Sequence, residues 1–446
     1  MAELSVAKRN AIEQLVRTAP ESVLRMLAAA FKDVGGEGAA AVREAVARED
    51  GERRVRAAVF APLLPLFGQR ADGVEARSFP HSVMVRLWRE LGARQPEAVG
   101  QAAEALAETR YDDPPAPVYD QLCLAAARLL RDPAVGVWPD GEAAELAAYF
   151  DLAPLARRGV ALLPEWTGKP TEAAATSFRL LLKDTTQIAE DGAPRILEIL
   201  LAHLPDAAQI LRVISLIRGG ADEHLLASSE LAGFGERLVE ALERRLEAIA
   251  NFRPEHGKDR ALAVAEDFAW CAALVEELSL TLELDQDGAW GRRVAHARDS
   301  LTRKMTALLR PCERLVDKAL PLERVRIAGQ MTRDQPRLSA PLDGPEVVEA
   351  RATMVLFKAV HKTAQAIGCG GLRAQIAEAL TTRILTYADD LIATLNAGEA
   401  EDEAHVRALA GVAAEFLGLA RDEDAARTVR RRVAVAGAPA GSQAGA

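Results

Sequence analysis

Aromatic residues are scarce in this chain of 446 residues, where Phe, Trp and Tyr together account for 4% of the sequence. Runs of Val, Ile and Thr that alternate strictly with polar residues are also missing, and such runs are the usual mark of a half-buried strand. Ala, Leu, Arg and Glu dominate instead, and these residue types favour helix. We therefore expect an all-α protein without a substantial sheet.

Cysteine is also rare, and the four residues Cys123, Cys271, Cys312 and Cys369 are far apart in the sequence. They form no CxxC pair, so the sequence favours reduced thiols in a cytosol over a disulfide framework. Nowhere do 18 apolar residues follow one another, as a membrane span requires, and charged residues among the first 17 positions argue against a secretory signal. We expect a soluble, cytoplasmic protein.

Positive charge is in deficit, because 65 Asp and Glu outnumber 55 Lys and Arg and give a formal charge of −10. General attraction to nucleic acid or to anionic membranes is therefore not expected. One compact basic cluster stands out near the end of the last expected helix, formed by Arg427, Arg430, Arg431 and Arg432. It is either a docking patch for an acidic partner, lipid headgroup or nucleic acid, or a set of cations that complement a helix C-terminus.

Catalytic and cofactor motifs are missing as well. None of the seven histidines forms an HxxxH pair or follows a glutamate by three positions, so the di-iron bundle and zincin signatures are absent. Neither Asp112-Asp113 nor Asp389-Asp390 has the third acid that a magnesium site usually needs, and we expect both pairs to be solvated. The sequence predicts no metal and no cofactor.

Two residues remain as weak ligand-site candidates. His361 falls on the apolar face of an expected helix, where it is either a packed core histidine or a ligand or general base. Cys369 lies between glycines just before an expected helix, whose dipole lowers the pKa of a nearby thiol. The alternative for Cys369 is a tight turn that carries an incidental thiol.

The spacing of apolar residues predicts an array of antiparallel helical hairpins. Short helices separated by Pro and Gly indicate a solenoid-like region at 1–112, followed by a helical middle region at 113–228. Longer helices form a C-terminal bundle at 229–432, in which Met331 to Gly344 reads as a polar loop. The Ala, Gly, Pro and Ser of 433–446 predict a disordered tail.

The central feature of the bundle is the segment from Lys258 to Leu320, which we expect to form two long helices that fold back on each other at Asp285 to Gly288. Each arm offers an apolar seam to the other, and ion pairs between the acidic first arm and the basic return arm favour the antiparallel register. Pro311 is expected to kink the return arm without breaking it. The groove between this hairpin and a second one, from Pro345 to Leu395, is the place where we expect any nearby function.

These features favour a cytoplasmic helical scaffold or adaptor that binds another protein, either by helix-in-groove recognition or on a composite concave surface. The competing hypothesis is an enzyme or small-ligand-binding protein with a site inside the C-terminal bundle, around His361. A third possibility is homo-oligomerisation through the hairpin at 258–320. The sequence does not identify the partner.

Overall fold

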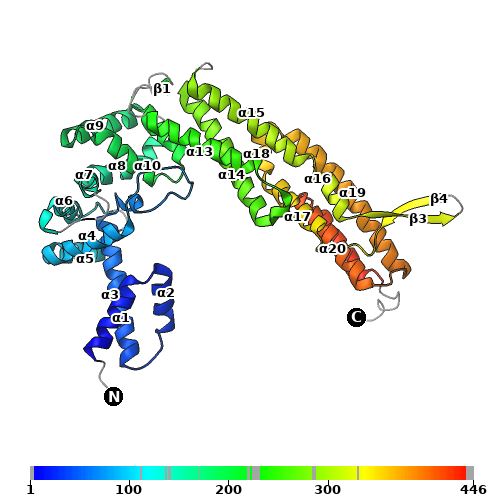
Figure 1. Ribbon diagram of the computed structural model, residues 1–446, viewed down its shortest axis with the longest axis horizontal. Coiled ribbons are helices and arrows are strands. Elements are labelled where there is room, and N and C mark those ends of the chain that lie inside the picture. The colour runs from blue at the N-terminus through cyan, green and yellow to red at the C-terminus, as the bar shows by residue number, and fades with distance from the viewer. Residues whose placement is uncertain are drawn as a thin grey trace. The chain divides into compact units, whose positions relative to one another are not determined.

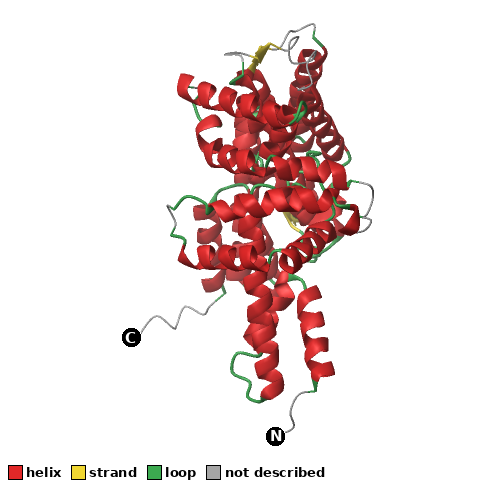
Figure 2. Ribbon diagram, turned by 90° about the vertical axis from the view of Figure 1, so that its left-hand side faces the viewer, coloured by secondary structure: helices red, strands yellow, loops and turns green. Residues whose placement is uncertain are grey.

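The computed structural model confirms an all-α, multi-helical protein, in which helices dominate the view of Figure 2. It describes residues 5–110, 113–135, 138, 142–169, 171–217, 221–222, 232–283, 288–328 and 331–437. The chain forms two compact units, Met1–Gly220 and Ala221–Ala446 (Figure 1). Among the residues described, no helix is long and apolar enough to cross a membrane.

The first unit is built mostly from short helices, which contact the next helices along the chain and also more distant ones, as α10 contacts η1. Helices α5 and α6 pack against each other, so the boundary expected between the regions 1–112 and 113–228 lies inside this unit. The elements are α1 (Val6–Thr18), α2 (Glu21–Ala30), α3 (Glu37–Val59), η1 (Leu64–Phe67), α4 (His81–Arg94), α5 (Pro96–Glu108), α6 (Pro117–Arg131), η2 (Pro133–Val135), α7 (Ala143–Asp151), α8 (Ala153–Trp166), α9 (Glu172–Ile188), α10 (Gly192–His203), η4 (Ala207–Gln209) and α11 (Ile210–Ser215).

Much of the small aromatic content of the chain is concentrated in the core of the first unit. Phe60 packs edge-on against Trp88 and Phe150, with ring centroids 5.7 and 5.1 Å apart. Both phenylalanines are fully buried. Because a buried aromatic side chain removes a large apolar area from water, these few rings tie α3, α4 and α7 together.

The second unit contains longer helices and two small sheets. Strand β1 pairs in parallel with β2, and β3 pairs with β4 in an antiparallel hairpin. The elements are β1 (Ala221–Asp222), α13 (Ala232–Ala250), η5 (Pro254–His256), α14 (Gly257–Thr281), β2 (Leu282–Glu283), α15 (Ala289–Leu309), α16 (Cys312–Ala319), β3 (Leu322–Ala328), β4 (Met331–Pro336), α17 (Pro345–Ala359), α18 (His361–Ala366), α19 (Gly370–Ala397), α20 (Glu403–Leu419) and α21 (Glu423–Val435).

The predicted central hairpin corresponds to α14 and α15, which run side by side in opposite directions (Figure 1). Arg298 Nη2 donates to Ser279 Oγ at 2.7 Å, which is the register expected for a turn near Gly288. The turn residues 284–287 lie outside the part of the chain that is described. Helix α14 contacts α15, as expected, and packs more extensively on α17.

Pro311 separates two helices where we expected one kinked helix. Helix α15 ends at Leu309 and α16 begins at Cys312, because proline has no N–H to donate to the preceding turn. The backbone of Arg310 (φ −56°, ψ −37°) and of Pro311 (φ −73°, ψ −10°) nevertheless stays in the right-handed helical region. Helix α16 therefore continues nearly along the line of α15 in Figure 1.

The β3–β4 hairpin is the main element that the sequence did not predict. Its register pairs Leu322 with Pro336 and Arg326 with Thr332, so the first half of the expected loop at 331–344 is a strand. Arg337 N also donates to Pro321 O at 3.0 Å and closes the base of the hairpin. In Figure 1 the two strands project beyond the helices of the second unit.

The C-terminal helix continues into the segment that was predicted to be a disordered tail. Helix α21 ends at Val435, and both Val433 and Ala436 are buried. Gly437 N donates to Asn396 Oδ1 at 3.2 Å, which fixes the end of the helix against α19. The rest of the predicted tail, 438–446, lies outside the described residues.

Candidate functional site

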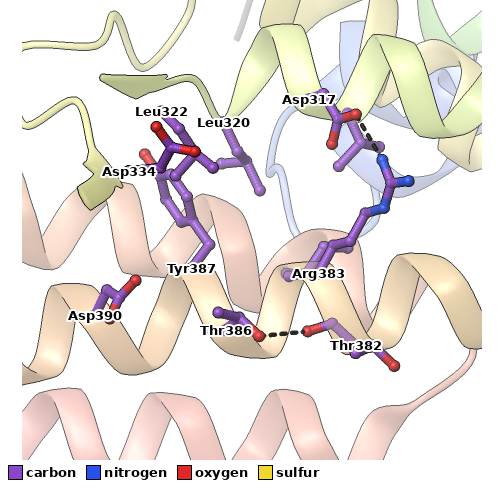
Figure 3. A pocket seen from close by; sticks show the side chains of 11 residues that line it. Asp317, Leu320, Leu322, Asp334, Thr382, Arg383, Thr386, Tyr387 and Asp390 are labelled. Carbon is purple, nitrogen blue, oxygen red and sulfur yellow. Dashed lines mark hydrogen bonds and ion pairs between the residues drawn. The ribbon is translucent and has the colours of Figure 1, made fainter. Parts of the chain in front are cut away.

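A pocket with a volume of about 590 Å³ lies within the second unit, between α16, the β3–β4 hairpin and α19 (Figure 3). It falls in the groove between the hairpins at 258–320 and 345–395 that the sequence singled out. Its apolar lining comes from Val316 and Leu320 at the end of α16, Leu322 at the start of β3 and Ile384 on α19. Leu322 is 57% exposed and forms an open wall of the pocket.

Helical spacing on α19 explains why one helix supplies both the floor and the rim of the pocket. Ile384 and Tyr387 lie three residues apart on its buried face. Arg383, Thr386 and Asp390 are offset by about one position and follow the same spacing of three and four. The polar rim therefore runs beside the apolar floor along two turns of a single helix.

Tyr387 carries the most distinctive polar group of the pocket. Only 4% of its surface is exposed, and its hydroxyl group has no hydrogen-bond partner among the residues described. Burial raises the pKa of this phenol to about 12, so the group stays protonated and is able both to donate and to accept. In Figure 3 its ring rises from α19 toward Asp334 and Leu322.

The carboxylates on the rim are each paired with an arginine. Asp317 accepts from Arg383 at 2.7 Å, and Asp390 accepts from Arg333 of β4 at 2.6 Å. Asp334 lies 3.5 Å from Arg324 on the facing strand. The arginine side chains of these pairs are at least half exposed, so each pair contributes at most about 1 kcal/mol and exchanges its partner easily.

The pocket therefore provides an apolar cavity and one hydroxyl group without a partner among the described residues. It also provides carboxylates whose arginine partners a ligand can replace. Its lining contains no histidine and no cysteine, so it provides no pairing of a nucleophile with a histidine base. In the part of the chain that is described, no group of three or more His, Cys, Asp or Glu is arranged to hold a metal ion. The arrangement suits the recognition of a ligand or a polypeptide segment.

His361 lies away from this pocket, at the first position of α18. It is partly buried, and its Nδ1 has no hydrogen-bond partner among the described residues. Burial, together with repulsion from Arg373, Arg421 and Lys362, lowers the pKa of its imidazole. The structure thus places His361 in a cationic environment.

Arg373 is a buried neighbour of His361 that the sequence did not single out. It is 5% exposed, its Nε donates to Phe357 O at 3.0 Å, and its guanidinium lies 4.2 Å from the centre of the Phe357 ring. It therefore caps the C-terminal end of α17, while its Nη2 finds no partner among the described residues. A single arginine in a helical pattern gives no sequence signal of such burial.

Cys369 is the N-cap residue of α19, as expected from its position before a helix. It is 4% exposed, and its Sγ lies 3.8 Å from both Thr302 O and Thr306 Oγ1 on α15. The other three cysteines are buried and free as well, and burial raises their pKa values to about 12. These thiols pack as small core side chains in the described structure.

The four arginines near the C-terminus do not share one surface. Arg427, Arg430 and Arg431 lie on one exposed face of α21, where Arg427 pairs with Asp424 one turn earlier. Arg432 points to α19 instead and pairs with Asp389 at 2.5 Å. Asp389 and Asp390 are thus both engaged by arginines, and Asp390 also lines the pocket.

Comparison of the chain with protein-family models, with curated proteins and with solved structures finds no match in any of the three. A helical fold hosts many unrelated activities, so the fold alone does not define the function of this chain.

Proposed function

We propose that this protein is a helical scaffold or adaptor that binds a segment of another protein in the pocket of the second unit. The observation that supports this most is the pairing of an open apolar wall at Leu322 with the unpartnered hydroxyl group of Tyr387. A polypeptide presents apolar side chains and backbone carbonyl groups together, and it satisfies both features at once.

The proposed segment inserts an apolar side chain between Leu320, Leu322 and Ile384 and brings a carbonyl oxygen to the Tyr387 hydroxyl group. Burial of one leucine-sized side chain contributes roughly 1.5 to 3 kcal/mol, and one neutral hydrogen bond adds about 0.5 to 1.5 kcal/mol. A basic residue on the segment replaces Arg324 or Arg333 beside the rim carboxylates. Contacts of this size support a reversible interaction.

The proposal is tested with a photo-crosslinking amino acid at position 322 of the full chain, in native extract. The crosslinked segment is identified, synthesised and titrated against the purified protein. Leu322→Asp should weaken its binding at least about tenfold, because the charge faces the apolar floor. Leu262→Asp is the matched control, since Leu262 on α14 is 44% exposed and lies outside the described pockets. Equal affinity of the two variants would contradict the proposal.

A small-ligand-binding protein or enzyme is the second candidate function, and the pocket volume of about 590 Å³ favours it because ligand sites commonly have this size. In that case no polypeptide crosslinks specifically at position 322, and a compound from a small-molecule screen loses affinity in both Leu322→Asp and Tyr387→Phe. Self-association through α14 and α15 stays a prediction, which sedimentation of the purified chain tests.

A further inference from the structure

A basic cleft lies within the first unit of this acidic chain. Its volume is about 910 Å³, and it is formed by the α1–α2 turn, α3, η1 and α4. Three carboxylates line it, against twice as many arginines: Arg17, Arg53, Arg54, Arg56, Arg86 and Arg89. The local charge therefore opposes the overall charge of −10.

Half of these arginines have partners in the protein. Arg53 pairs with Glu49 at 2.7 Å and also donates to Ala19 O at 2.8 Å. Arg54 pairs with Asp50 at 2.6 Å, and Arg86 donates to Val135 O at 3.0 Å. The other three are Arg17, Arg56 and Arg89, and in the described structure their side chains form no hydrogen bond and no direct ion pair.

Arg56 is the key residue of the cleft because it is partly buried and has like charges as neighbours. Burial lowers the pKa of its guanidinium; attraction by Glu49 and Glu52 opposes this shift, and repulsion from Arg53 and Arg89 adds to it. A partly desolvated cation without a direct partner costs stability in the free protein. Groups held at such a cost are characteristic of sites that bind the opposite charge.

The spacing of the arginines suits a helical partner with carboxylates on successive turns. Arg53 and Arg56 are three residues apart on α3, and Arg86 and Arg89 are three apart on α4. Apolar side chains line the cleft as well, among them Leu64 and Val85. No Phe, Tyr or Trp side chain lines it and His81 is its one aromatic ring, which disfavours nucleic acid because unpaired bases are usually held by stacking on several aromatic rings.

We infer that this cleft binds an acidic amphipathic segment of a partner protein, whose carboxylates pair with Arg56 and Arg89 and whose apolar side chains lie on Leu64 and Val85. Guanidinium groups bind carboxylates through two parallel hydrogen bonds, which gives the interaction geometric specificity. The inference goes beyond the proposed pocket of the second unit, since it gives the protein a second and chemically different docking site.

The test measures fluorescence anisotropy of a labelled helical peptide with Glu on one face and Leu on the other, titrated with the full chain. Arg56→Met and Arg89→Met should each weaken binding at least about tenfold. Arg128→Met is the matched control, because Arg128 is an exposed arginine of α6 outside the cleft, and its affinity should stay within about twofold of the original. Without peptide, Arg56→Met should raise the midpoint of urea unfolding. This result would show that the variant is folded and that its weaker binding has another cause.

Several outcomes would overturn the inference: no binding of the peptide, equal affinity for a scrambled peptide of the same composition, or equal losses in Arg56→Met and Arg128→Met. Tighter binding of a short DNA duplex that also depends on Arg56 would assign the cleft to nucleic acid and overturn it too. Leu322→Asp should leave binding of the acidic peptide unchanged. A failure of this inference is therefore distinguishable from a failure of the site proposed in the second unit.

Discussion

Tyr387 is buried to all but 4% of its surface, and its hydroxyl group has no partner among the described residues. A buried polar group in this state costs about 1 to 3 kcal/mol, whereas a phenyl ring of the same shape avoids the cost. Tyr387→Phe should therefore leave the free energy of unfolding unchanged or raise it by up to about 1 kcal/mol. Urea unfolding followed by circular dichroism measures this.

The same substitution should weaken binding of the crosslinked segment, because the hydrogen bond to its carbonyl group is lost. A fall in stability of more than about 1 kcal/mol would show that the hydroxyl group already has a hydrogen-bond partner in the free protein. That result would remove the main support for a binding site in this pocket. Thr382→Val is a suitable control, since Thr382 lines the same pocket and its hydroxyl group already donates to Glu378 O, one turn earlier, at 3.1 Å.

At the scale of elements, Gly192 permits the close approach of α9 and α10. A Cβ atom at this position would lie 2.3 Å from the backbone oxygen of Thr185, so the two helices would have to move apart. Gly192→Ala should cost about 1 to 3 kcal/mol, the usual penalty for overpacking. The midpoint of urea unfolding of the full chain measures the loss.

Gly100→Ala, in the same unit, should have the opposite effect on stability. Gly100 lies inside α5, and nothing stands within 4 Å of an added Cβ, so the change should raise stability by about 0.5 to 1 kcal/mol through a better helix propensity. If both substitutions changed stability in the same direction, steric contact between α9 and α10 would not be the reason for glycine at position 192.

The helices were predictable because each must bury an apolar stripe with a period of 3.6 residues, and the spacing of apolar residues in the sequence shows this period. The β3–β4 hairpin was not, because apolar and polar residues alternate in it only over Val325 to Ile327, and Leu322, Arg324 and Val325 are all exposed. Backbone pairing stabilises such a ribbon, and every residue type except proline supplies both backbone groups.

The sites were predictable only in part. The groove beside the central hairpin followed from the expected helix pairing, but the unpaired hydroxyl group of Tyr387 depends on which atoms meet there. The basic cleft was missed because its lining comes from four separate segments between Arg17 and Arg89. In sequence Arg56 and Arg89 look like solvated helix positions, and only the folded structure shows that Arg56 is partly buried.

For the molecule as a whole, acidification should lower stability even though it reduces the net negative charge. Burial lowers the pKa values of His81, His203 and His361 below the ordinary value near 6.5. Between these lowered values and about 6.5 the unfolded chain binds more protons, so stability rises with pH in this window and falls as pH decreases through it. The urea midpoint should therefore fall between about pH 7.5 and 5.5.

A second loss should follow at lower pH, because Arg195 and Arg293 hold the pKa values of Asp191 and Glu243 below their ordinary range. These two carboxylates contribute their full stabilisation above the pKa values near 4 that they have in the unfolded chain. The stabilisation is lost as the pH falls below those values. His203→Gln should reduce the first loss, since its side chain amide still donates to Pro62 O but does not titrate. A midpoint that rises on acidification would show that relief of charge repulsion outweighs the histidines.

The two-stranded ribbon of β3 and β4 also has a consequence for how copies of this protein meet one another. Among the described residues the two strands pair with each other, which leaves an outer edge at which a strand of another molecule would pair. Arg324, Arg326 and Arg333 are exposed along the ribbon, where Arg324 pairs with Asp334 and Arg333 with Asp390, and charged side chains on an edge disfavour pairing with another strand. We expect these charged side chains to disfavour edge-to-edge association of two copies, so that the ribbon stays open beside the pocket.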